Sequence, residues 1–130
     1  MLHTSPEVQL AIERALSEDC VFADPTTGTL IPPDLRGTGI IRAKAGGVLA
    51  GVEVCLAVFQ RIDGALETRA VLPDGAPLAP GDTIARVQGS AGSILRGERT
   101  ALNFVQRMSG IATETARYVQ AVQGTRARII

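Results

Sequence analysis

The sequence predicts an α+β fold, in the form of a small open α/β sandwich with a mainly antiparallel sheet. Three observations support this class. Apolar residues recur every three or four positions in several segments, which is typical of helices packed on one face. Short, partly alternating apolar segments lie between them and favour strands. Asp-Gly and Pro-Gly pairs separate the short segments and favour the tight turns that join antiparallel strands.

The composition fits one ordinary hydrophobic core, because the chain has 130 residues of which 45% are hydrophobic. Thirteen basic residues balance thirteen acidic ones, so no overall field favours nucleic acid or an anionic membrane surface. The apolar runs are far shorter than the roughly 20 residues that cross a bilayer. We therefore expect no nucleic-acid partner and no membrane partner, and any anion site must be local.

The cysteine pattern points to packing rather than to metal binding. Cys20 and Cys55 form no Cys-x-x-Cys pair, and the single histidine is His3, close to the N-terminus. With no secretory leader visible, two separate cysteines favour a reducing, cytoplasmic location. The sequence predicts no metal site built from these residues.

The N-terminal part predicts one helix and one loop. Ser5 is a plausible cap before Pro6, and the apolar repeat that follows indicates an amphipathic helix ending near Asp19. Prolines and glycines then interrupt residues 20–34, which predicts an ordered loop with a brief extended piece at 29–31. Its aspartates fit caps and turns better than magnesium ligands.

The middle of the chain predicts strands around one helix. Residues 39–45 read as a strand, Gly46-Gly47 as a turn and residues 48–50 as a short apolar strand. Residues 52–62 have helical spacing, which predicts a short helix that ends before Asp63-Gly64. We expect further strands at 66–72 and 83–88, separated by turns at Asp74-Gly75 and Pro80-Gly81. The small residues 89–93 then precede the next helix.

The segment 96–113 predicts a long helix with an arginine-bearing polar side. Its buried stripe is expected to contain Ile94, Leu95, Leu102, Val105, Met108, Ile111 and Ala112. Glu98, Arg99, Gln106 and Arg107 are left for other surfaces. A guanidinium on a packed helix is a good receptor for carboxylate or phosphate, because its planar fork donates two parallel hydrogen bonds. A helix with a merely solvated charged face gives the same spacing, and the pattern leaves both interpretations open.

Several blocks in this order resemble one enzyme family. They are Glu18-Asp19, Asp24-Pro25-Thr26-Thr27, Ala43-Lys44-Ala45-Gly46-Gly47-Val48-Leu49-Ala50-Gly51, Asp74-Gly75, Pro80-Gly81-Asp82, and Glu98 to Asn103 with Ser109 to Ala112. Together they resemble quinolinate phosphoribosyltransferase, the carboxylating nicotinate-nucleotide pyrophosphorylase. The segment from Cys20 to Pro25 departs from the family's glycine-bearing step before Thr-Thr. The blocks from Glu98 to Ala112 are the most specific part of the resemblance.

The resemblance implies two parts. Residues 1–112 correspond to the N-terminal α/β sandwich domain, and residues 113–130 to the truncated start of the phosphoribosyltransferase barrel domain. In that reading residues 113–123 form the barrel domain's opening helix, and residues 127–130 its first strand. A strand without its barrel cannot complete its ladder of hydrogen bonds, so the tail is expected to be poorly anchored or paired with another chain.

The resemblance also implies a reaction and a site. The family joins quinolinate to phosphoribosyl pyrophosphate with Mg2+, and gives nicotinate mononucleotide, pyrophosphate and carbon dioxide in NAD biosynthesis. Its subunits share the active site in a homodimer or higher oligomer, and the arginine at position 99 helps to bind quinolinate in the neighbouring subunit. Glu98 and Arg107 are possible supporting residues. Catalytic residues and metal ligands are expected in the barrel, so the 130-residue chain alone is expected to be inactive.

Three alternatives remain open. A paralogue group from molybdate transport operons shares the architecture and would take another substrate. A biotinyl or lipoyl carrier would need a lysine at a hairpin tip, and Lys44 lacks the flanking residues of such carriers. A standalone oligomerisation or interaction domain would use the amphipathic long helix as its contact surface.

Overall fold

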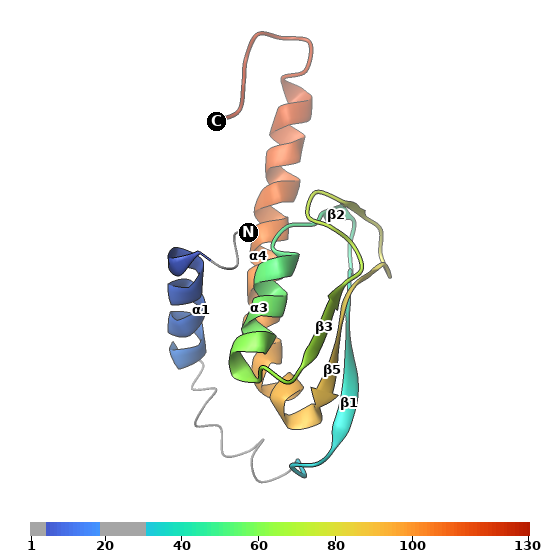
Figure 1. Cartoon of the computed structure of the whole chain (residues 1–130). Helices are drawn as coiled ribbons and strands as arrows, with labels where there is room; N and C mark the ends of the chain where they lie inside the picture. The colour runs from blue at the N-terminus through green and yellow to red at the C-terminus, as the bar shows by residue number, and fades with distance from the viewer. Residues whose placement is uncertain (1–4, 19–30) are drawn as a thin grey trace.

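Figure 1 shows the computed structural model of the chain, which describes residues 5–18 and 31–130. The described elements are, in order, α1 (Pro6–Glu18), β1 (Arg36–Arg42), β2 (Gly47–Val48), α3 (Val52–Ile62), β3 (Glu67–Ala70), β4 (Pro77–Leu78), β5 (Thr83–Ser90) and α4 (Ala91–Ala121). Helices alternate with short strands, as expected. The predicted loop at 20–34 lies mostly outside the described residues.

The sheets are antiparallel, as predicted. β5 is the central strand of a three-stranded sheet in the order β1-β5-β3, and β2 pairs with β4 in a separate two-stranded sheet. The helices α3 and α4 lie together on one face of the larger sheet, while its other face carries no helix in the described part of the chain (Figure 1). This arrangement confirms the α+β class and the open two-layer sandwich.

Strand pairing corrects the interpretation of residues 39–50. β1 starts at Arg36 rather than at residue 39, and it pairs with β5 instead of with the segment after Gly46-Gly47. That segment contributes only the two residues of β2, whose partner is β4. The first residues of β1 are polar and show no alternation of apolar and polar side chains, so the sequence did not predict a strand there. The strand forms because this segment pairs with one that lies 50 positions away in the chain.

The core lies between the larger sheet and the two long helices. Its fully buried side chains include Leu49, Val52, Val58 and Val87, and α1 adds Ile12 and Leu16. Burial of this apolar surface is the dominant favourable term in folding. α1 begins as expected, because the Val8 amide donates to the Ser5 hydroxyl at 3.2 Å. An ion pair between Glu13 and Arg61 also joins α1 to α3.

α3 has the predicted bounds, and its N-terminus is capped by a carboxylate that lies later in the chain. Asp74 accepts hydrogen bonds from the amides of Gly51 and Val52, at 3.1 and 3.0 Å. These amides have no partner within the helix, and the positive end of the helix dipole favours a negative charge beside them. The predicted Asp74-Gly75 turn is therefore also the N-terminal cap of a core helix.

Replacing Asp74 with alanine is expected to lower the free energy of unfolding by about 1–2 kcal/mol, because the capping bonds and the favourable charge are both lost. Urea unfolding of the variant measures this change. Asp34→Ala is the matched control, since Asp34 is an exposed carboxylate with no hydrogen bond in the described part of the chain. Equal stability of the two variants would contradict the capping role.

Cys55 lies on α3 and is fully buried. Desolvation by burial raises the pKa of its thiol to about 12, so the thiol stays protonated at neutral pH and behaves as a small apolar side chain. The packing role expected for Cys55 is confirmed, whereas Cys20 lies outside the described residues. No helix in the described part of the chain is long and apolar enough to span a membrane.

Candidate functional site

The candidate site lies on α4, a helix of 31 residues that is about 46 Å long at the usual rise per residue. It begins at Ala91 rather than at residue 96, because the Ser90 hydroxyl accepts a hydrogen bond from the Ser93 amide at 3.3 Å and caps the first turn. Gly92 and Ser93 therefore belong to the helix and not to a preceding loop. The helix also continues through Thr113, where the predicted second part of the chain starts.

The buried face of α4 differs from the predicted stripe. Small residues occupy its centre, namely Ser93, Gly97, Thr100, Ala101 and Val105. A Cβ atom on Gly97 would lie 2.9 Å from both Phe59 and Ile62, so the missing side chain lets α4 approach α3 closely. Leu95 and Ile111 were expected in the stripe, but they are 47% and 68% exposed. Val105 is buried as predicted, and Ile94, Leu102 and Met108 pack against the core, so the stripe was right in part; it missed the small residues that close helix packing selects.

A polar network fixes the first turns of α4. Asp63, which follows α3, accepts hydrogen bonds from the Ala65 amide at 2.9 Å and from the Ser93 hydroxyl at 2.8 Å. A guanidinium nitrogen of Arg96 donates to the same hydroxyl at 3.3 Å. The amide of Ala65, and then Ser93, hold the pKa of Asp63 below its ordinary value, and the nearby charges of Arg96 and Arg36 lower it further.

Because the pKa of Asp63 is lower in the folded chain, its ionised form stabilises the fold above the unfolded value of 3.8, and this contribution is lost as the pH falls through the folded value. Asp63→Asn is expected to cost about 1 kcal/mol at pH 7 and little in strong acid. Urea unfolding of both proteins across this range measures the difference. A gap that stays constant at all pH values would contradict a role for the charge.

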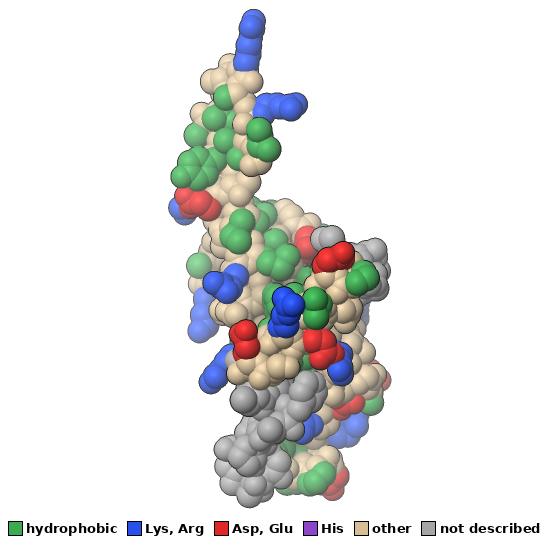
Figure 2. Space-filling model, turned by 90° about the vertical axis from the view of Figure 1, so that its left-hand side faces the viewer, with side chains coloured by type: hydrophobic (Ala, Val, Ile, Leu, Met, Phe, Trp, Pro, Cys, Tyr) green, Lys and Arg blue, Asp and Glu red, His purple; other side chains and the backbone are tan. Residues whose placement is uncertain are grey.

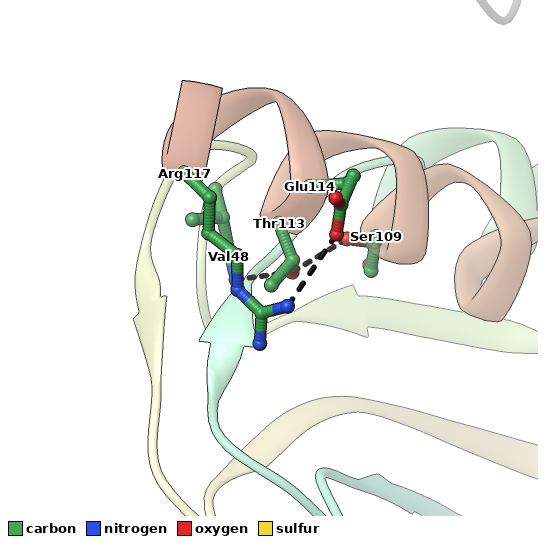
Figure 3. Close-up of polar contacts among 5 residues, drawn as sticks. All are labelled: Val48, Ser109, Thr113, Glu114 and Arg117. Carbon is green, nitrogen blue, oxygen red and sulfur yellow. Dashed lines mark hydrogen bonds and ion pairs between the residues drawn. The ribbon is translucent and has the colours of Figure 1, made fainter. Parts of the chain in front are cut away.

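Two hydroxyls hold α4 against the segment that contains β2, and Figure 3 shows the contacts of one of them, that of Thr113. The Thr113 hydroxyl accepts a hydrogen bond from the Val48 amide at 2.9 Å and donates to the Ser109 carbonyl at 2.7 Å. The Ser109 hydroxyl accepts from the Ala50 amide and donates to its carbonyl, at 3.0 and 3.1 Å. These side chains supply the partners that a neighbouring strand would otherwise supply.

Beyond Thr113 the helix stands clear of the rest of the molecule, with hydrophobic side chains on its surface (Figure 2). Tyr118 and Val119 are 57% and 45% exposed. Glu114 and Arg117 form an exposed ion pair at 3.4 Å. Residues 127–130 form no strand in this structure, and the division of the chain into parts at 112 and 113 stays a prediction.

Arg99 is exposed on the side of α4 that faces away from the core. Its side chain makes no hydrogen bond or ion pair in the described part of the chain, so its fork of donors is available to an external group. Glu98, next to it, is also exposed and lines a groove between α4 and β1. The helix on which both residues lie is fixed near both ends of the sheet, which gives Arg99 a defined position.

Arg107 is exposed as well, but helix geometry separates it from Arg99 by about 12 Å along the axis and about 80° around it. The structure therefore does not bring the two guanidinium groups together on one anion. No group of three or more His, Cys, Asp or Glu in the described residues could hold a metal ion. Asp34 is exposed in a turn, and Asp19 and Asp24 lie outside the described residues. Magnesium was expected only for the complete enzyme, with its ligands in the barrel, and that expectation stays a prediction.

The residues that position α4 were not identified as such from the sequence. Ser109, Thr113 and Ser93 act through contacts with distant segments, and only Ser109 lies within a block that resembles the family. Thr100, in the same helix, is buried, and Asn103 is exposed. Arg99 thus offers an external guanidinium on a fixed helix, and a second surface is needed to enclose a ligand.

Comparison with known sequences identifies a family and longer relatives. Residues 24–109 match the family described as "Quinolinate phosphoribosyl transferase, N-terminal domain". A nicotinate-nucleotide pyrophosphorylase [carboxylating] of Mycobacterium leprae is 42% identical over 121 residues, which cover 91% of this chain and 43% of the relative. A quinolinate phosphoribosyltransferase [decarboxylating] of Nicotiana tabacum is 37% identical, with 92% of this chain and 34% of the relative covered.

Solved structures agree with the sequence comparison. The chain matches NadC from Streptococcus pyogenes with a TM-score of 0.86 and 35% identity, over 94% of this chain and 44% of that one. The nicotinate-nucleotide pyrophosphorylase from Francisella tularensis gives a TM-score of 0.82 and 26% identity, over 90% and 42% of the two chains. The chain thus spans less than half the length of these relatives. Because the family match covers most of the chain, and includes the part of α4 that carries Arg99, this chain belongs to the family of quinolinate phosphoribosyltransferase N-terminal domains.

Proposed function

We propose that this chain is the N-terminal part of an enzyme that converts quinolinate and phosphoribosyl pyrophosphate into nicotinate mononucleotide, pyrophosphate and carbon dioxide in NAD biosynthesis. The names of the relatives support the reaction, since they are pyrophosphorylases and phosphoribosyltransferases of this kind. The single observation that carries our assignment of a role to this chain is the exposed guanidinium of Arg99, which lies on a fixed helix and has no partner among the described residues.

In our proposal Arg99 binds a carboxylate of quinolinate in the active site of a neighbouring subunit. Quinolinate and phosphoribosyl pyrophosphate are both anions, so their approach needs fixed positive groups around them. A guanidinium offers two parallel hydrogen bonds to a carboxylate, and it stays charged at all physiological pH values. The rigid attachment of α4 orients these donors before the substrate arrives, which lowers the entropic cost of binding.

Glu98 and Arg107 are proposed as supporting residues. Glu98 is adjacent to Arg99 and is placed to pair with a cation of the neighbouring subunit, which would orient the contact. Arg107 extends the basic surface along α4 without reaching the same carboxylate. We assign no step to magnesium, because the described residues contain no cluster that could hold it.

The chain alone is expected to be inactive, because one guanidinium is a small part of a preorganised electrostatic site. Incubation of the complete protein with quinolinate, phosphoribosyl pyrophosphate and magnesium chloride tests the proposal, with nicotinate mononucleotide measured by chromatography. The expected result is product from the complete protein and none from the 130-residue chain. Failure of the complete protein to consume quinolinate would favour the molybdate-operon paralogue or an interaction domain instead.

A further inference from the structure

Two side chains of α4, those of Ser109 and Thr113, bind the main chain of residues 47–51, and we call this pair the hydroxyl clamp. The Val48 amide donates to the Thr113 hydroxyl at 2.9 Å, as Figure 3 shows, and the Ala50 amide donates to the Ser109 hydroxyl at 3.0 Å. The bonds of the clamp require one setting of the helix. A shift of α4 by one residue would move each hydroxyl by about 1.5 Å along the axis and turn it by about 100°.

Two glycines allow residues 47–51 to lie directly against α4. A Cβ atom on Gly47 would lie 2.6 Å from the Thr113 hydroxyl, and one on Gly51 would lie 2.5 Å from the sulfur of Met108. The main chain therefore contacts the helix at both ends of this segment with no side chain between them. Because such close packing leaves little free space, the segment resists a displacement of the helix toward it.

The hydroxyl clamp contacts a different side of α4 from the side that packs on α3. Gly97 faces Phe59 and Ile62 of α3, and helical spacing places Ser109 about 120° around the axis from Gly97. Apolar packing is non-directional, so the contact at Gly97 holds α4 close to α3 but leaves the helix free to rotate about it. Hydrogen bonds depend on direction, and those of the clamp on a second side oppose this rotation.

Arg99 lies on α4 between the contact at Gly97 and the hydroxyl clamp, so rotation of the helix displaces its exposed side chain. A group at the helix surface is about 6 Å from the axis, and a rotation of about 10° moves it by about 1 Å. Misplacement of a substrate-binding group by this distance is enough to lower a rate by about a hundredfold. The rotation of α4 therefore matters to any ligand that Arg99 binds.

We infer that Ser109 and Thr113 are positioning residues for the proposed contact between Arg99 and quinolinate, and that they act by fixing the rotation of α4. This inference rests on the proposed function, because it requires that Arg99 binds the substrate. Both hydroxyls are already engaged within the chain, so they act through Arg99 rather than on the ligand itself. Loss of the clamp should thus affect quinolinate and leave phosphoribosyl pyrophosphate almost unaffected.

The test is a double-mutant cycle in the complete enzyme, measured by steady-state kinetics. Thr113→Val removes one hydroxyl of the clamp with little change of shape, and Ser109→Ala removes the other. Each change is expected to lower kcat/KM for quinolinate by about tenfold and to leave the KM for phosphoribosyl pyrophosphate within about twofold. In an enzyme that already carries Arg99→Ala, the same changes should alter kcat/KM for quinolinate by less than about twofold, because the residue through which they act is missing.

Two further variants are controls for the loss of the Thr113 hydroxyl. Thr113→Ser keeps the hydroxyl and is expected to retain kcat/KM for quinolinate within about twofold of the unmodified enzyme. Thr83→Val is the matched control, because Thr83 lies on β5 and its side chain makes no hydrogen bond in the described part of the chain, so it should change kcat/KM by less than about twofold. Ser109→Ala tests the clamp by itself if Thr113→Val does not fold.

The cycle separates failure of this inference from failure of the proposed function. If Arg99→Ala lowers kcat/KM for quinolinate, but the clamp variants lower it by the same factor with and without Arg99, the clamp does not act through Arg99 and the inference is wrong. The same conclusion follows if folded clamp variants have unchanged kinetics. If Arg99→Ala itself leaves the kinetics unchanged, the proposed role of Arg99 is wrong, and the inference that rests on it is wrong too.

Discussion

Replacing Arg99 with alanine in the complete enzyme is expected to lower kcat/KM for quinolinate by about a hundredfold to a thousandfold, the effect of removing about 3–4 kcal/mol of transition-state binding. The reason is that a carboxylate in a water-excluded site loses a bidentate partner and stays unpaired. Steady-state kinetics with each substrate in turn measures the change. We expect the KM for phosphoribosyl pyrophosphate to change much less, because Arg99 is assigned to quinolinate alone.

Arg86→Ala is the matched control for Arg99→Ala. Arg86 is an exposed arginine with no ion pair in the described residues, and it lies on the sheet rather than on α4. Its loss removes the same charge from a different surface, so kcat/KM should stay within about threefold of the unmodified enzyme. Arg99→Lys separates charge from geometry, since an ammonium cannot donate the parallel pair. Equal kinetics of the Arg99→Ala and Arg86→Ala enzymes would reject the assignment.

Replacing Gly51 with alanine is expected to lower the free energy of unfolding by about 2–4 kcal/mol, through two independent effects. Gly51 has a φ of 85°, in the left-handed region that side chains disfavour. An added Cβ atom would also lie 2.5 Å from the sulfur of Met108 and 3.1 Å from its Cβ, so α4 would have to move away from α3. Urea or thermal unfolding measures the loss.

Gly75→Ala separates the two effects at Gly51. Gly75 has a similar φ of 88°, but a Cβ atom there would meet nothing within 4 Å, so only about 1 kcal/mol of backbone strain is expected. Combining Gly51→Ala with Met108→Ala should recover part of the loss, because the second change removes the clashing atoms. If the Gly51 and Gly75 variants were equally stable, the close approach of Met108 to Gly51 would contribute nothing to the loss in free energy of unfolding.

The sequence predicted most of the elements because their signals are local. α3 was predicted with its observed bounds, since its apolar spacing ends at Asp63-Gly64 and its start follows Gly51. α1 and β5 were also predicted near their observed places. The start of α4 was misplaced because glycine and serine at 89–93 read as a loop, whereas the Ser90 cap and close packing against α3 allow a helix there.

Contacts between residues that lie far apart in the chain could not be predicted from the sequence. Ser109 and Thr113 bind amides 59 and 65 positions away, and Asp74 caps a helix 22 positions before it. No periodicity encodes such partners. The exposed position of Arg99 followed from helical spacing, and its expected role followed from resemblance to a family. Its target cannot be read from one chain, because the ligand in our proposal is enclosed by another subunit.

Subunit complementation of the complete enzyme tests most directly whether Arg99 acts across a subunit boundary. An Arg99→Ala enzyme and a second enzyme, inactivated only within its barrel site, are dissociated, mixed and reassociated, and quinolinate turnover is measured. Our account predicts that the mixture regains activity, because a mixed dimer joins an intact barrel to an intact Arg99. A mixture as inactive as its two parents, with mixed dimers shown to be present, would contradict it.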